Sequence, residues 1–143
     1  GGYGGLARCL GEISQNTNIS IVDLPPMLNT QKIFLHSTTN FKKRLNFTND
    51  LNKLNRKYDI FNASFSFSEV PLNKRKVVED FIIKKCLKAH IIFQDSFNGI
   101  DNRQYMKNFA ARLKNKKWKV FIKPYHWYGW KSAQVMYASI AKN

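Results

Sequence analysis

The sequence has few cysteines, few acidic residues and no long hydrophobic run. Cys9 and Cys86 lie far apart, and no group of cysteines and histidines has the spacing of a zinc site. Both cysteines lie in apolar patterns with helical spacing, which favours two reduced, buried thiols. No run of about 18 apolar residues and no signal-peptide pattern is present, so we predict a cytoplasmic protein without a transmembrane segment.

The scarcity of acidic residues gives the chain an unusual charge. Its 24 Lys and Arg against 9 Asp and Glu leave a net charge of +15. A charge of this size attracts nucleic acid, anionic membrane surfaces or acidic substrates. The lysines are scattered over the whole chain, however, and such a distribution is also found in proteins whose overall composition is rich in lysine. A nucleic-acid partner is therefore an alternative that the charge leaves open.

The remaining composition is that of a folded domain with alternating strands and helices. Hydrophobic residues make up 43% of the 143 residues, which excludes a disordered chain. Alternation predicts crossover connections and a parallel sheet, and two consecutive final strands predict an antiparallel pair. We therefore expect one α/β domain over residues 1–143. The expected strands are 18–23, 45–48, 58–67, 90–94, 118–124 and 134–140, and the expected helices are 6–15, 27–36, 71–87 and 103–114.

The expected helix over 71–87 has a marked apolar stripe. Its lysines and arginines are predicted to face solvent. The residues predicted to face inward are Val77, Val78, Phe81, Ile82 and Cys86.

The chain begins with a glycine loop, and an acidic residue follows it at the spacing that is typical of nucleotide-binding folds. Gly1 to Gly5 contains four glycines, which permit a tight turn and let a ligand approach the backbone closely. Asp23 lies about 20 residues further on, at the end of the next expected strand, where a carboxylate can bind both hydroxyls of a ribose. This pattern predicts a cofactor that contains a nucleoside. A plain glycine turn with a solvent-facing acid is the simpler alternative.

Three segments resemble known motifs of one enzyme family. The run 1–8, GGYGGLAR, resembles the first motif of class I S-adenosylmethionine-dependent methyltransferases, and the run 21–25, IVDLP, is similar to the second. The run 58–71, YDIFNASFSFSEVP, resembles the fourth-strand segment of one subgroup, the sugar O-methyltransferases of bacterial polysaccharide clusters. The resemblance covers essentially the whole chain and implies a Rossmann-like methyltransferase fold, mostly parallel with an antiparallel C-terminal strand.

The resemblance also implies a cofactor, S-adenosylmethionine, and the positions that bind it. These are Gly2, Tyr3 and Gly4 for the methionine part, Asp23 for the ribose, Leu24 and Asp50 for the adenine, and Asn62, Ala63 and Ser64 beside the sulfonium. In the family a strand with an acidic residue precedes the glycines. We therefore expect this chain to be the C-terminal part of a longer enzyme.

Methyl transfer to a sugar hydroxyl needs a group that removes the proton of the hydroxyl. Glu69 is the first candidate base, because it follows the fourth-strand segment, although an acid near a helix start is also favoured by the helix dipole. His126 is the second candidate, because histidine titrates near neutral pH. Its aromatic loop, 125–131, is equally suited to stacking on a sugar and to packing the hairpin. A divalent metal at Asp95 is conceivable, but one acid does not make a metal site.

The sequence therefore predicts an O-methyltransferase that acts on a sugar hydroxyl of a surface polysaccharide or a nucleotide-sugar precursor. Two alternatives follow from the charge and the aromatic residues: an RNA methyltransferase, and a non-enzymatic basic module that binds nucleic acid.

Overall fold

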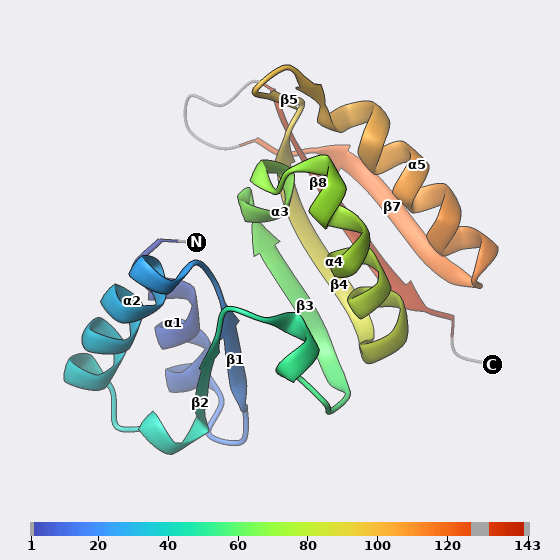
Figure 1. Ribbon diagram of the computed structural model, residues 1–143. Coiled ribbons are helices and arrows are strands. Elements are labelled where there is room, and N and C mark those ends of the chain that lie inside the picture. The colour runs from blue at the N-terminus through green and yellow to red at the C-terminus, as the bar shows by residue number, and fades with distance from the viewer. Residues whose placement is uncertain (1, 127–131, 142–143) are drawn as a thin grey trace. The chain divides into compact units, whose positions relative to one another are not determined.

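The computed structural model describes residues 2–126 and 132–141, which form two compact units, Gly1–Asn55 and Arg56–Asn143. We call them unit 1 and unit 2 and describe each by itself (Figure 1). Within the described residues, no helix is both long enough and apolar enough to cross a membrane.

Unit 1 contains a pair of parallel strands with a helix before each of them. The strands pair in register, from Ile19 opposite Leu45 to Val22 opposite Thr48. Pro25 and Pro26 begin the second helix, where a missing backbone N–H costs nothing. The elements are α1 (Gly5–Ile13), β1 (Ile19–Val22), α2 (Pro25–Thr38) and β2 (Leu45–Thr48), with short 3₁₀ turns at Lys42–Arg44 and Leu51–Lys53.

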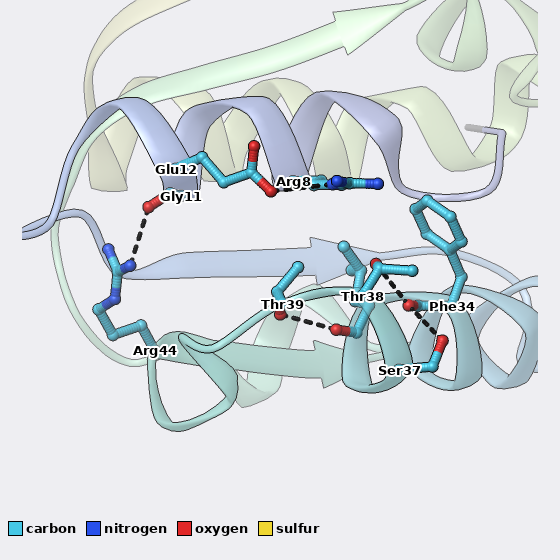
Figure 2. Close-up of polar contacts among 9 residues, drawn as sticks. Arg8, Gly11, Glu12, Phe34, Ser37, Thr38, Thr39 and Arg44 are labelled. Carbon is cyan, nitrogen blue, oxygen red and sulfur yellow. Dashed lines mark hydrogen bonds and ion pairs between the residues drawn. The ribbon is translucent and has the colours of Figure 1, made fainter.

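The side chain of Arg44 closes the C-terminal end of α1 (Figure 2). Its guanidinium donates hydrogen bonds to the carbonyls of Gly11 (2.8 Å), Ser14 (2.6 Å) and Thr17 (3.2 Å). The carbonyl of Gly11 lies in the last turn of α1, where a helix runs out of its own donors, and those of Ser14 and Thr17 belong to the segment that follows. The same guanidinium lies 4.6 Å from the centre of the Phe41 ring, which packs on Gly11. Arg44 therefore holds the end of α1 and the Phe41 ring together.

Unit 2 is a four-stranded sheet with two long helices on one face (Figure 1). The strand order is β3-β4-β8-β7; β3 and β4 are parallel, and β8 runs antiparallel to both of its neighbours. The elements are β3 (Tyr58–Ser64), α3 (Ser66–Glu69), α4 (Leu72–Lys85), β4 (Cys86–Gln94), β5 (Ser96–Phe97), β6 (Ile100–Asp101), α5 (Asn102–Asn115), β7 (Trp118–Pro124) and β8 (Ala133–Ile140).

The core of unit 2 lies between this sheet and its helices. Phe93, Met106, Phe109 and Leu113 are completely buried, as is Met136 on β8. Side chains of one face of each strand supply the sheet's share, because successive residues of a strand point to opposite faces. This packing fixes β3 and β4, whose carboxyl ends carry the residues that the sequence analysis singled out.

The structure confirms the α/β fold with parallel strand pairs and an antiparallel C-terminal pair. The strand expected over 58–67 ends earlier, at Ser64, because Phe65 has a φ of +66° and turns the chain into α3. The sequence analysis also missed the small hairpin of β5 and β6, whose turn residues Asn98 and Gly99 both have positive φ.

Two expectations about the face of α4 were wrong. Val77 was expected inside and is about half exposed, and Arg75 was expected in solvent and is completely buried. The apolar stripe of α4 is diluted by charged residues, so periodicity alone placed the buried face imprecisely.

The expectation of two buried thiols is half correct. Cys9 is exposed on α1. Cys86 is buried, but it begins β4 rather than ending a helix. Burial raises the pKa of the Cys86 thiol to about 12.

The contact between Gly11 and Phe41 gives a stability prediction. In Gly11→Ala, the new Cβ would lie 2.2 Å from atoms of the Phe41 ring, which Arg44 holds in place. We expect the free energy of unfolding to fall by about 1–3 kcal/mol, as in other overpacked sites, measured by urea denaturation.

The matched control is Gly5→Ala at the other end of α1. A Cβ there meets nothing within 4 Å, so we expect a gain of about 0.5–1 kcal/mol from the reduced freedom of the unfolded chain. Equal unfolding midpoints for the two variants would show that Phe41 does not pack on Gly11 as described.

Candidate functional site

The glycine loop of unit 1 uses backbone conformations that favour glycine. Gly2 has a φ of +67° and Gly4 a φ of +96°, both in the left-handed region. Gly4 caps the start of α1, and its carbonyl accepts the N–H of Arg8 at 3.0 Å. A Cβ on Gly4 would lie only 3.1 Å from Leu35. The loop therefore owes its path to Gly2 and Gly4, while Tyr3 between them is exposed.

Gln31 on α2 joins the glycine loop to Asp23. Its side chain is 1% exposed, and its Nε2 donates to the carbonyl of Gly2 (2.8 Å) and to Oδ2 of Asp23 (2.9 Å). Both partners are acceptors, which fixes the orientation of the amide. Oε1 of Gln31 is buried without a hydrogen-bond partner among the described residues. The structure thus brings together the loop and the acid that the sequence analysis had linked only by spacing.

Asp23 and Leu24 follow β1 directly. Oδ1 of Asp23 accepts the backbone N–H of Leu24 at 2.8 Å, so protein donors hold both carboxylate oxygens. The Leu24 side chain is 70% exposed beside this carboxylate. Asp50 follows β2, the parallel neighbour of β1, and its Oδ1 accepts the N–H of Asn52 at 2.9 Å. A capping role accounts for the position of Asp50, and its predicted contact with adenine stays a prediction.

In unit 2, the three residues predicted beside the sulfonium lie on β3 and point to different faces. Ala63 is buried in the core under the helices. Asn62 and Ser64 are exposed on the strand. Oδ1 of Asn62 lies 2.6 Å from Nδ1 of His90, and burial lowers the pKa of this histidine. Only the backbone of Ala63 is available to a ligand on the exposed face.

A tight turn connects β3 to α4 and carries Glu69. Phe65 has the positive φ that begins the turn, and its N–H donates to the carbonyl of Ile92 at 2.7 Å. Phe67 and Ser68 are buried, whereas Glu69 is exposed. The Ser68 hydroxyl lies 2.6 Å from the Phe65 carbonyl, so the turn is closed from inside. A non-glycine residue with positive φ at such a place is typical of functional loops.

His126, the second candidate base, and Asp95, the candidate metal ligand, lie in different surroundings. His126 is exposed after β7, and residues 127–131 of its aromatic loop lie outside the described residues. The carboxylate of Asp95 accepts hydrogen bonds from Arg103 and Gln134, as in a structural role. Among residues 2–126 and 132–141, no group of three His, Cys, Asp or Glu is placed to hold a metal ion.

Two side chains that hold candidate residues in place were not predicted from the sequence. Gln31 lies on α2, and the hydrophobic periodicity of this helix does not predict its hydrogen bonds. Arg75 is buried beneath the Glu69 turn, but its helix pattern placed it in solvent. A polar residue eight positions after Asp23, inside an otherwise apolar helix face, is the one signal that was available for Gln31.

Two surface hollows lie away from these groups. One, of about 370 Å³, lies on the uncovered face of the unit 2 sheet and includes His90, Phe121 and Tyr137. The other, of about 700 Å³, lies in unit 1 between Gly11 and the segment 38–44. The hollow in unit 2 reaches the candidate residues only through His90, the partner of Asn62.

Comparison with known proteins identifies the fold. No protein-family model and no curated protein matches the sequence. The methyltransferase domain of bacterial CtHen1 has a similar structure, with a TM-score of 0.75 at 15% identity over 97% of this chain and 86% of that one. The mitomycin 7-O-methyltransferase MmcR gives 0.67 at 12% identity, over 99% of this chain and 47% of that one.

A third similar structure is a chain of the Pnkp1/Rnl/Hen1 RNA repair complex, with a TM-score of 0.71 at 9% identity over 96% of this chain and 35% of that one. At these identities the likeness concerns the fold alone. The chain has a Rossmann-like, class I methyltransferase fold, as the sequence analysis expected.

The Gln31 bridge leads to a prediction about the glycine loop. Gln31→Leu keeps the buried volume but leaves the Gly2 carbonyl and Asp23 without this donor. We expect the free energy of unfolding to fall by about 1–3 kcal/mol, because these part-buried acceptors lose their partner. Gln104→Leu, the same change on the exposed face of α5, should stay within about 0.5 kcal/mol of wild type. Equal effects of the two variants in urea denaturation would contradict the bridge.

Proposed function

We propose that the protein is an S-adenosylmethionine-dependent O-methyltransferase that acts on a sugar hydroxyl. One observation carries the proposal: a glycine turn and the acid that follows the next strand are joined by the single buried amide of Gln31. The fold agrees with it, because similar folds occur in methyltransferases. The sugar acceptor rests on the resemblance of the segment 58–71 to sugar O-methyltransferases.

The residues of unit 1 fit the cofactor. The left-handed Gly2 allows a ligand to approach the backbone without a Cβ in the way, because nothing lies within 4 Å of a Cβ built on it, while Gly4 keeps the loop close to Leu35. The Asp23 carboxylate is oriented by two protein donors and is suited to accept ribose hydroxyls. The exposed Leu24 offers apolar surface to an adenine. Oε1 of Gln31 supplies a buried acceptor beside the loop.

The cofactor supplies a methyl group that its sulfonium makes electrophilic, and the protein must supply alignment and a base. We assign the base to Glu69. Its carboxylate is exposed at the end of a closed turn, where it can take the proton from a sugar hydroxyl as the oxygen attacks. Asn62 and Ser64 are exposed on β3, and the resemblance of the segment 58–71 implies that they lie beside the sulfonium. His126 is the second candidate base.

An RNA acceptor is the second candidate function. The net charge of +15 favours a polyanion, and similar folds are found in structures of an RNA repair complex. Binding through lysines to phosphates would weaken steeply as salt is raised. A nucleotide-sugar acceptor, which carries only two phosphate charges, would show a much shallower dependence.

Cofactor binding gives the first functional prediction. Titration calorimetry of the purified protein should detect S-adenosylmethionine binding, and Asp23→Ala should weaken it about 10- to 100-fold, the value of one hydrogen bond to a charged group. Asp59→Ala removes an exposed carboxylate from β3 and should leave the Kd unchanged.

Absence of binding to the wild-type protein would defeat the proposed function. An unchanged Kd in Asp23→Ala would defeat only the ribose assignment. RNA binding without cofactor binding would instead support the basic nucleic-acid-binding module.

Acceptor identity gives the second functional prediction. We expect label from S-adenosyl-[methyl-³H]methionine to enter a panel of UDP- and GDP-sugars rather than a single-stranded RNA, with a rate that changes little between low and moderate salt. Glu69→Gln should lower kcat by about 100-fold or more, as expected for a lost general base. Labelled RNA, with a steep salt dependence, would shift the assignment to the RNA methyltransferase.

A further inference from the structure

The guanidinium of Arg75 holds the backbone on both sides of Glu69. Its Nη2 donates to the carbonyl of Ser68 at 2.6 Å, and its Nε donates to the carbonyl of Val70 at 2.7 Å. These are the residues immediately before and after Glu69. Arg75 is completely buried, whereas the Glu69 side chain is exposed. One buried fork therefore fixes the backbone on both sides of the candidate base.

Burying the guanidinium of Arg75 costs free energy, so the contacts that compensate for this cost indicate its role. Arginine is rarely fully buried unless it is paired. No carboxylate among the described residues forms a salt bridge with Arg75; it contacts the two carbonyls and aromatic rings. Its guanidinium carbon lies 4.6 Å from the centre of the Tyr105 ring and 6.0 Å from that of Phe67. The guanidinium therefore binds the backbone of the turn and does not form an ion pair with a described residue.

A second layer of contacts keeps the Arg75 fork in place. The hydroxyl of Tyr105 donates to Oε1 of Glu79 at 2.5 Å, and Glu79 is 1% exposed. The guanidinium of Arg112 binds the same carboxylate through Nη2 (2.5 Å) and Nε (3.2 Å). The ring behind Arg75 is therefore fixed at its far end. Such a layered arrangement limits the rotamers open to Arg75.

We propose that Arg75 is a positioning residue for Glu69. The bidentate fork sets the place and direction in which Glu69 leaves the turn, so that its carboxylate meets the acceptor hydroxyl in one geometry. The inference rests on the proposed function, in which Glu69 is the base, and goes beyond it by naming what aligns that base. Arginine is required because lysine, a single point donor, cannot span two carbonyls in a fixed geometry.

The test combines a conservative variant with a variant of its target. Arg75→Lys keeps the positive charge and much of the volume but removes the fork. We expect kcat for methyl transfer to UDP- and GDP-sugars to fall about 10- to 100-fold, as for a misplaced catalytic group, while the Kd for S-adenosylmethionine stays within about twofold. Once Glu69 is replaced by Gln, the loss of Arg75 should cost little more, because the two act as a unit.

Arg112→Lys is the matched control. It keeps a positive charge beside the Glu79 carboxylate, does not touch the turn, and has a side chain that is 45% exposed. Its effect on kcat should be less than about threefold and should multiply with that of Glu69→Gln, as independent effects do. Multiplicative effects of Arg75→Lys and Glu69→Gln would overturn the proposal, because Arg75 would then act through the general fold.

A measurement without substrate separates this inference from the proposed function. The N–H of Ser68 donates to the Phe65 carbonyl, and that of Val70 donates to the Phe67 carbonyl. Amide exchange at both positions should accelerate about tenfold or more in Arg75→Lys, and not in Arg112→Lys, because local opening becomes easier. Unchanged exchange would refute the positioning role even if methyl transfer is observed. Wild-type protein that exchanges as expected but transfers no methyl group would refute the proposed function alone.

Discussion

The candidate cofactor site depends on the two hydrogen bonds that the buried amide of Gln31 donates. Neither the glycine loop nor the Asp23 carboxylate is rigid by itself, since both lie at the ends of regular elements. One nitrogen atom binds both, at 2.8 Å and 2.9 Å, from a helix that is packed on the same sheet. A left-handed turn and a carboxylate thereby become a single preorganised surface. Preorganisation of this kind lowers the entropy that a ligand must otherwise lose on binding.

Unit 2 follows the same physical principle around Glu69. There a buried cation, Arg75, binds the carbonyls that flank an exposed acid. In both units a solvent-accessible group suited to chemistry is held in place by a buried polar side chain. Buried polar groups are costly when they are unpaired, so their geometry is narrowly defined once they are paired. The chemistry that we propose depends on these hidden contacts as much as on Asp23 and Glu69.

The sequence predicted the elements and the surface chemistry better than the contacts beneath them. The strand over 118–124 and the strand over 45–48 were located to the residue, although the pattern of the second is weak. The link from glycines to Asp23 followed from spacing. Gln31 and Arg75 were not found, because each binds at least one backbone carbonyl, and a sequence does not distinguish one carbonyl from another. Phe65 was predicted to lie in a strand, because a phenylalanine side chain gives no indication of a positive φ.

A crystal structure of the protein with S-adenosylhomocysteine tests the central claim most directly. The account predicts that the ribose hydroxyls donate to the Asp23 carboxylate, that the homocysteine part lies against Gly2 to Gly4, and that Gln31 keeps its two hydrogen bonds. A nucleoside bound elsewhere in the molecule, with Asp23 and the glycine loop empty, would contradict it.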